Sequence, residues 1–312
     1  MIPDRYSIII DGQKIALDTT ELPMGLQIIK DLTPLAALKH LNKLYLCWSL
    51  ISDLTPLAEL KELTTLDLSR NRIIDLTPLS NLTQLKKLIL NQNQVIDLRP
   101  LANLTQLKVL CLAENQCVDL TQLKGLKSLS ILDLSHNPIT DLSPLMALTR
   151  IIDLRLSGIQ ITDLSFLPNM KQLRSLYLSE CQIVTLPPLV GLTRLEWLDL
   201  CNNRISDLTP LVGLPRLGTL YLNRNQISDL SPLAYIPKLH ELFLEHNTIT
   251  NLTPLTKLNW LSRLYLEGNP ITDLTPLIDM PMLRELNIRG CPIQKRSLTA
   301  FRKARPDCHV EI

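Results

Sequence analysis

The chain has 312 residues, of which 46% are hydrophobic, 4% aromatic and 20% charged, and its formal net charge is +2. This balance argues against a disordered, solvating chain and against a nucleic-acid binder that relies on bulk positive charge. The low aromatic and glycine counts are typical of a uniform aliphatic core.

The N-terminus lacks a cationic segment followed by a long apolar one, so no secretory signal is expected. No run of 18 apolar residues predicts a membrane span. The seven cysteines are scattered without a CxxC spacing, which gives no support to a zinc or redox site. We therefore expect a cytoplasmic protein with reduced cysteines, no cofactor and no metal.

Residues 1–30 are predicted to form an N-terminal cap. The segment 6–17 predicts a β-hairpin with a type I′ turn at Asp11-Gly12. Glu21-Leu22-Pro23-Met24 and Ile29 then fall in the register of the repeats that follow, which predicts a half repeat.

Twelve units of 22 residues fill 31–294, and the step never slips. The segment DLTPL at 53–57, for example, recurs at 75–79 and 207–211. Positions 2, 5, 8, 11, 14, 16 and 21 of each unit are apolar throughout. Positions 14 and 16 alternate as in a strand, whereas positions 2, 5, 8 and 11 step by three as in a tight helical turn. One such coil cannot bury its apolar face alone, so stacked coils are expected.

Polar residues mark the ends of these elements. Thr or Ser at position 3, followed by Pro at position 4, predicts a hydroxyl N-cap and a short helical turn. Asn at position 19 predicts a buried ladder that bonds the turn backbones of neighbouring coils. This Asn occurs at 71, 93, 115, 137, 203, 225, 247 and 269. Repeats 6–8 depart from the pattern, which indicates either drift or a softer joint.

Residues 295–312 predict a C-terminal cap. Ser297 is placed as the N-cap of a short helix with Leu298 and Phe301 on one face, and Val310 and Ile312 alternate as a final strand. The cap also concentrates five basic residues, for which a solvated face is favoured over a nucleic-acid or lipid contact. They are Lys295, Arg296, Arg302, Lys303 and Arg305.

The LxxLxLxxNxI pattern on a 22-residue step, with its DLTPL linker, resembles the leucine-rich repeat family, and specifically its internalin-like bacterial class. The resemblance implies an α/β solenoid: an arc with a parallel β-sheet on the concave side and short 3₁₀ or α segments on the convex side. It does not imply a particular partner.

Positions 13, 15 and 17 flank the inward leucines and should face outward on the concave side. Five of the twelve aromatics in the chain occupy position 15, four of them in repeats 7–11, where Trp197 joins them at position 13. Clustered aromatics indicate a binding site, although strand packing is the alternative. Acidic residues outnumber basic ones eight to five at these positions, which disfavours nucleic acid and favours a protein partner with a basic surface. The candidate partner-binding residues are Tyr177, Trp197, Asp199, Tyr221, Glu241, Phe243, Glu245, Arg263, Tyr265 and Glu267.

No enzyme signature is present. Cys111, Asp133 and His136 are the one Cys-Asp-His group that the register brings together, and a regular sheet offers them no cleft. The sequence therefore predicts a non-enzymatic, monomeric protein-recognition scaffold that does not enter membranes. A regulatory or inhibitory subunit of an intracellular enzyme and an exported internalin-like adhesin or effector are the alternatives.

Overall fold

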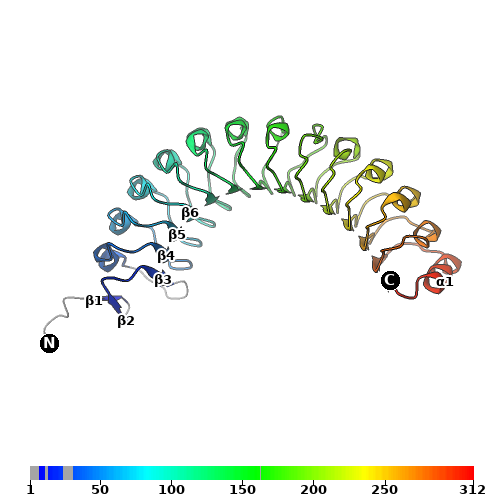
Figure 1. The fold of residues 1–312 in the computed structure, drawn as a ribbon, viewed down its shortest axis with the longest axis horizontal. Helices are drawn as coiled ribbons and strands as arrows, with labels where there is room; N and C mark the ends of the chain where they lie inside the picture. Colours follow the sequence, from blue (N-terminus) through cyan, green and yellow to red (C-terminus); the bar gives the residue numbers. More distant parts are fainter. Residues whose placement is uncertain (1–6, 11–12, 24–30, 162) are drawn as a thin grey trace. The chain divides into compact units, whose positions relative to one another are not determined.

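The structure is a computed structural model that describes residues 7–10, 13–23, 31–161 and 163–312. The chain divides into two compact units, Met1–Ile151 and Ile152–Ile312, which we call unit 1 and unit 2. The division falls inside the sixth repeat. In each unit, three-residue strands line the inner side of the coils and short 3₁₀ turns line the outer side (Figure 1).

Unit 1 begins with an antiparallel hairpin of β1 (Ser7–Ile10) and β2 (Gln13–Ala16), as the sequence predicts. The Asp11-Gly12 turn lies outside the described residues, as do Met24 and Ile29. β3 (Glu21–Pro23) pairs in parallel with β4 (Lys43–Tyr45), so the half repeat is in register with the first full repeat. The remaining elements of unit 1 are η1 (Thr33–Ala37), η2 (Thr55–Leu57), β5 (Thr65–Asp67), η3 (Thr77–Leu79), β6 (Lys87–Ile89), η4 (Arg99–Leu101), β7 (Val109–Cys111), η5 (Thr121–Gly125), β8 (Ile131–Asp133) and η6 (Ser143–Ala147).

In unit 2 every pairing between neighbouring strands is parallel and advances by one repeat, up to a last strand that belongs to the C-terminal cap. The elements of unit 2 are β9 (Asp153–Arg155), η7 (Leu167–Asn169), β10 (Ser175–Tyr177), β11 (Trp197–Asp199), η8 (Thr209–Leu211), β12 (Thr219–Tyr221), η9 (Ser231–Tyr235), β13 (Glu241–Phe243), η10 (Thr253–Lys257), β14 (Arg263–Tyr265), η11 (Thr275–Leu277), β15 (Glu285–Asn287), α1 (Lys295–Ala304) and β16 (His309–Glu311).

The core of each unit is a stack of like residues. Leu220 of β12, for example, pairs with Leu242 of β13, and both are fully buried. Most of the other apolar positions are buried in the same way, because a constant 22-residue step places each side chain against its counterpart in the next coil. The repeat architecture predicted from the sequence is therefore confirmed.

The start of each 3₁₀ turn differs from the prediction. The residue before each turn that begins at position 3 is the leucine at position 2, and it makes no side-chain cap bond. Instead, the Asp at position 1 accepts the backbone N–H of position 3, as Asp53 does from Thr55 at 2.8 Å. Eleven repeats share this bond, with Asn251 taking the place of Asp in one of them. The hydroxyl N-cap was thus wrong, because Leu at position 2 already has near-helical torsions and moves the capping role back by two residues.

The predicted asparagine ladder is confirmed. Asn93 donates through Nδ2 to the carbonyls of Leu68, at 2.9 Å, and Leu90, at 3.0 Å. Its Oδ1 accepts the N–H of Ile73 at 3.0 Å. Because two of these three groups belong to the preceding coil, each Asn ties neighbouring repeats together in the interior. Two repeats have a cysteine at the asparagine position. There the thiol contacts the carbonyl of the preceding coil that the Asn side chain bonds elsewhere: Cys181 contacts the Leu156 carbonyl and Cys291 that of Leu266.

Repeat 8 is the most irregular coil. No 3₁₀ turn forms between β10 and β11, where Thr185-Leu186-Pro187-Pro188 replaces the usual DLTPL segment. The N–H of Leu189 instead donates to the carbonyl of Pro210, one repeat further on, at 3.0 Å. Phe166, in the proline position of repeat 7, is fully buried, and η7 begins two residues late.

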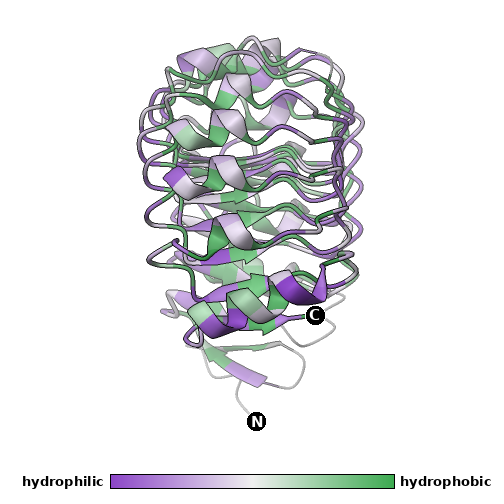
Figure 2. Cartoon of the chain, turned by 90° about the vertical axis from the view of Figure 1, so that its right-hand side faces the viewer, coloured by the Kyte–Doolittle hydropathy of each residue, from purple (hydrophilic) through white to green (hydrophobic). Residues whose placement is uncertain are grey.

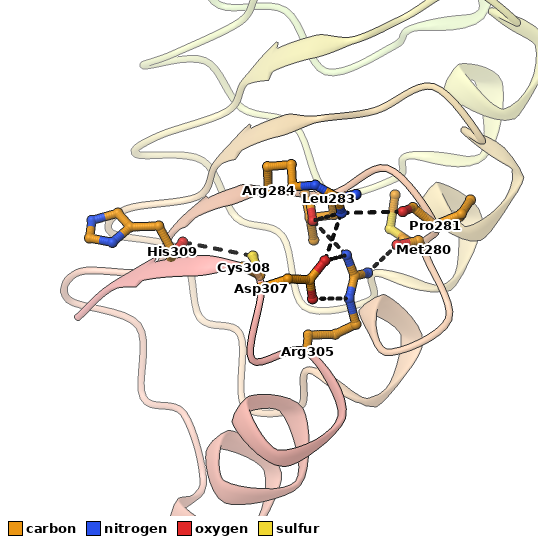
Figure 3. A network of polar contacts seen from close by, with 8 residues as sticks. All are labelled: Met280, Pro281, Leu283, Arg284, Arg305, Asp307, Cys308 and His309. Carbon is orange, nitrogen blue, oxygen red and sulfur yellow. Dashed lines mark hydrogen bonds and ion pairs between the residues drawn. The ribbon is translucent and has the colours of Figure 1, made fainter.

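The C-terminal cap corrects two predictions. α1 begins at Lys295 rather than at Ser297, whose hydroxyl bonds Asp273 and the Leu274 N–H, each at 2.7 Å. Arg305 is not part of an exposed basic face. It is 8% exposed, and its guanidinium donates to the carbonyls of Met280 and Leu283 and contacts Asp307 (Figure 3).

Other predicted features of the cap are present. Phe301 is fully buried, Leu298 is half-buried, and Val310 lies in β16, beside Leu286 of β15. Ile312 is exposed. The remaining basic residues of α1 are solvent-exposed, and the helical ribbon near the C label in Figure 2 has purple, hydrophilic stretches. No helix in the described ranges is long and apolar enough to span a bilayer.

Candidate partner-binding face

The outward residues of unit 2 follow from the period of the strands. In β12, Leu220 points into the core while Thr219 and Tyr221 flank it on the other side of the sheet. We call the surface made by positions 13, 15 and 17 of repeats 6–12 the sheet face of unit 2.

Three aromatic rings stack on this face. The parallel register places Tyr221 beside Phe243 and Phe243 beside Tyr265. The ring centroids of the first pair are 4.1 Å apart with planes inclined by 4°, and those of the second pair are 4.6 Å apart with an inclination of 9°. Because such stacking fixes each ring against its neighbours, these side chains are ordered before any partner arrives.

Trp197 and Tyr177 continue the row. Trp197 lies at position 13 of β11, yet its ring reaches across to Tyr221, with centroids 5.0 Å apart, and to Tyr177, at 6.3 Å. The guanidinium of Arg155 lies over the Tyr177 ring at 4.9 Å. The five aromatics predicted as anchors therefore form one continuous row, which we call the aromatic ladder. All five are half-buried rather than fully exposed.

The aromatics outside this row lie elsewhere. Tyr45 holds the same strand position but belongs to unit 1. Trp48 is 58% exposed and has the Arg70 guanidinium over its ring at 3.8 Å. Tyr235 and Trp260 are exposed and lie outside the strands. The sheet face of unit 2 is thus where the aromatic side chains make a common surface.

Two acidic residues beside the ladder are paired within the chain. Glu241 forms an ion pair with Arg263 of β14 and accepts the Thr219 hydroxyl at 3.2 Å. Glu285 accepts the Tyr265 hydroxyl at 2.5 Å, and burial together with this bond raises the pKa of Tyr265 to about 12. Glu241 and Arg263, both candidate partner-binding residues, therefore form an ion pair with each other.

Asp199 is also engaged in local structure. Its Oδ1 accepts the N–H of Cys201 at 2.9 Å, which holds the backbone just after β11. Burial first, and the Asp199 charge second, raise the pKa of the Cys201 thiol. The thiol therefore stays protonated at neutral pH, which does not favour a nucleophile.

Glu245 and Glu267 behave differently. They follow β13 and β14 at position 17 of consecutive repeats. The Oε2 atom of Glu245 is buried and has no hydrogen-bond partner among the described residues. Burial, and then the charge of Glu267, raise the pKa of Glu245. Trp197 Nε1 is the other buried side-chain atom without a partner in the described part of the chain. The register distinguishes Glu245 from Glu241, because Arg263 lies directly opposite Glu241 whereas the position-17 neighbours of Glu245 are Asn223 and Glu267.

The net negative charge of the outward positions is confined to unit 2. In unit 2 these positions hold six acidic and three basic residues, whereas in unit 1 they hold two of each. No cluster of three or more potential metal ligands occurs within the described ranges. The arrangement thus offers an acidic, aromatic surface without a metal centre in that part of the chain.

Comparisons with known proteins agree with this architecture. The family model described as "Leucine Rich repeats (2 copies)" matches residues 61–103, 105–145, 193–235 and 237–279, which is more than half of the chain. Two further leucine-rich repeat models match residues 172–192 and 279–301. A search of curated proteins returned no match.

Solved structures resemble the chain over most of its length. An internalin, InlF of Listeria monocytogenes, is 29% identical, with 96% of this chain and 89% of that chain covered and a TM-score of 0.87. A leucine-rich repeat protein of Leptospira interrogans is 22% identical, with coverages of 95% and 93% and a TM-score of 0.62.

A plant peptide hormone receptor, RGFR1 in complex with RGF2, is 20% identical, with coverages of 90% and 48% and a TM-score of 0.72. At this identity it shows the fold alone. The family matches, the 22-residue coils and the likeness to InlF lead to one assignment: the chain belongs to the leucine-rich repeat family and is internalin-like.

Proposed function

We propose that the sheet face of unit 2 is a binding surface for a protein partner and that the chain acts as a non-enzymatic recognition scaffold. The observation that carries this proposal is the aromatic ladder, which gathers five of the twelve aromatic residues on one surface. Aromatic side chains dominate the binding energy of protein interfaces, and rings already held in place lose little conformational entropy on binding.

Two further facts support a protein rather than a nucleic acid. The outward positions of unit 2 carry a net negative charge, which repels a phosphate backbone. Proteins of this repeat family generally mediate protein–protein contacts, and the plant receptor of the same fold is solved with RGF2 bound. A partner with a basic surface would complement this face.

The proposal predicts that the ladder is required for capture of the partner. We expect the variant Tyr221→Ala, Phe243→Ala, Tyr265→Ala to lose a protein that wild type retains in affinity capture from a lysate of the source organism. The reason is that about 1 kcal/mol or more is lost with each truncated anchor, so three together lower the affinity by a factor of 100 or more.

The matched control is Tyr235→Ala, Trp260→Ala, which removes two exposed aromatics outside the strands. It should retain the captured protein as well as wild type does. Circular dichroism checks that every variant is folded. Equal capture by wild type and the triple variant would show that the ladder serves strand packing alone.

A further inference from the structure

The carboxylates on the two sides of the aromatic ladder differ in whether they are paired with other side chains of the protein. On the side of strand position 13, Glu241 is paired with Arg263, and Glu285 is bonded by the Tyr265 hydroxyl. A cation from a partner would have to displace these internal contacts before it could bind either carboxylate. This side of the ladder is therefore already compensated by the chain itself.

On the side of position 17, Glu245 and Glu267 are neighbours without such compensation. No ion pair links either carboxylate to a basic side chain in the described part of the chain. Asn287 makes only a long contact, of 3.5 Å, from its Nδ2 to Glu267 Oε2. Glu245 is partly dehydrated, and its Oε2 has no hydrogen-bond partner among the described residues. Burial raises the pKa of Glu245, and the backbone hydrogen bonds of Glu245 and Leu244, which favour the charged form, offset this only in part.

The basic residues that are close in register are directed elsewhere. Arg289, at position 17 of the next repeat, approaches Glu311 at 3.8 Å. The ring of His246 lies against the backbone of Gly268, where an added Cβ would come within 2.5 Å of its Nδ1. Arg224, at position 18 of the repeat before that of Glu245, is exposed. The carboxylate pair is thus left for a cation from outside.

We propose that Glu245 and Glu267 are the cation-binding half of the partner site, and that they receive a lysine or arginine side chain of a protein segment whose apolar residues cover Tyr221, Phe243 and Tyr265. This inference rests on the proposed function and specifies the chemistry of the partner and its orientation: its basic residue lies on the position-17 side of the ladder. The net negative charge of this face, and the lack of an ion pair from either carboxylate to a basic side chain of the described residues, select a basic occupant. The neighbouring ring faces add cation–π attraction.

The first arm of the test concerns stability. A carboxylate kept for a partner should destabilise the free protein, so we expect Glu245→Gln to raise the urea midpoint at pH 7. The pKa of Glu245 is raised in the folded state, so its protonated form stabilises the protein below about pH 4.5 and this contribution is lost as the pH rises. The gain from Glu245→Gln should therefore vanish near pH 4. A gain that is absent at pH 7 would overturn the inference.

The second arm concerns recognition. Phage-displayed twelve-residue peptides are selected on the wild-type protein, and the affinities of the enriched peptides are measured by fluorescence anisotropy. We expect enrichment of Lys or Arg near aromatic or aliphatic residues. The variant Glu245→Gln, Glu267→Gln should bind such a peptide about tenfold more weakly, as the loss of a charge-assisted bond implies. Replacing the basic residue of the peptide by Met should abolish the difference between the two proteins.

The control is Asp133→Asn, which removes one outward negative charge from unit 1 and should leave peptide affinity unchanged. Selection without enrichment of basic residues, or unchanged affinity in the Glu245, Glu267 variant, overturns the inference. If the peptide is still lost by the triple alanine variant, the proposed function survives that failure. If the triple variant binds as wild type does, the proposed function fails as well. Concentration-dependent self-association that Glu245→Gln removes would identify a second copy as the occupant and would also overturn the inference.

Discussion

At the scale of single residues, the interior asparagines decide how firmly neighbouring coils are joined. Asn225 donates to the carbonyls of Leu200 and Leu222, at 2.9 and 3.0 Å, and accepts the N–H of Ile205 at 3.0 Å. Asn225→Ala would leave these buried groups unpaired, at about 1–3 kcal/mol each where water cannot enter. We expect the free energy of unfolding, measured in urea, to fall by about 2–5 kcal/mol.

A graded control is available at the same position. Cys181 and Cys291 occupy the asparagine position of their repeats and still contact the carbonyl of the preceding coil. Asn225→Cys should therefore cost less than Asn225→Ala, since it keeps a weak donor and loses only the acceptor. Gln226→Ala, at an exposed neighbour, should be neutral. Equal losses for the Cys and Ala variants would contradict a role for the side-chain donor.

At the scale of elements, α1 and β16 close unit 2 through one buried cation. The guanidinium of Arg305 bonds the carbonyls of Met280 and Leu283 and contacts Asp307, so it joins the cap to the last repeat (Figure 3). Arg305→Met should remove about 2–3 kcal/mol, because bonds to charged donors are worth about 1.5–3 kcal/mol each and part of the loss is recovered by packing. The loss should be local, with amide exchange in His309–Glu311 accelerated first.

The exposed Arg302 of the same helix provides the comparison for this prediction. Arg302→Met should leave both the exchange rates of β16 and the melting temperature unchanged. If Arg305→Met behaved in the same way, the cap would be held by Phe301 and the strand pairing alone. The sequence could not show that Arg305 is buried and Arg302 exposed, because both are basic residues near the end of the predicted helix. Only the carbonyls of Met280 and Leu283, at positions 8 and 11 of the last repeat, distinguish Arg305 from Arg302.

At the scale of the whole molecule, the sequence predicted what the repeat period dictates. A side chain that returns every 22 residues must lie against its counterpart, so the inward leucines, the asparagine ladder and the stack of Tyr221, Phe243 and Tyr265 all follow from register. Contacts across the register could not be predicted. Trp197 reaches the ladder from a different strand position, and the Tyr265 hydroxyl at position 15 bonds Glu285 at position 13 of the next repeat.

The backbone conformation at position 18 of the repeats could not be predicted from the sequence either. Its φ is positive in all twelve repeats, yet nine of these residues are not glycine. Trp48 and Arg70 are examples, and both donate their N–H to a carbonyl of the next repeat. This bond extends the strand pairing beyond the strand itself and offsets the strain of the left-handed region. Residue type carries no signal here, because the neighbouring coil and not the side chain imposes the conformation.

The same repetition makes stability depend on pH. Hydrogen bonds from the Thr two residues on, through side chain and backbone, lower the pKa of Asp53, Asp119 and Asp207 in the folded state. A lowered pKa stabilises the protein above the unfolded value of about 3.9, and this contribution is lost as the pH falls through and below that value. We therefore expect the urea midpoint of wild type to drop steeply between about pH 4 and pH 2.

Asn251 supplies the control for this prediction, since it makes the same turn without a charge and accepts the Thr253 N–H at 2.9 Å. The variant Asp53→Asn, Asp119→Asn, Asp207→Asn should thus keep its turns and remain folded at pH 7. Its urea midpoint should decline less than that of wild type between pH 4 and pH 2, because three groups that must take up protons on unfolding are gone. Parallel pH profiles for the two proteins would instead assign the acid sensitivity to repulsion among the basic side chains, which the substitutions leave in place.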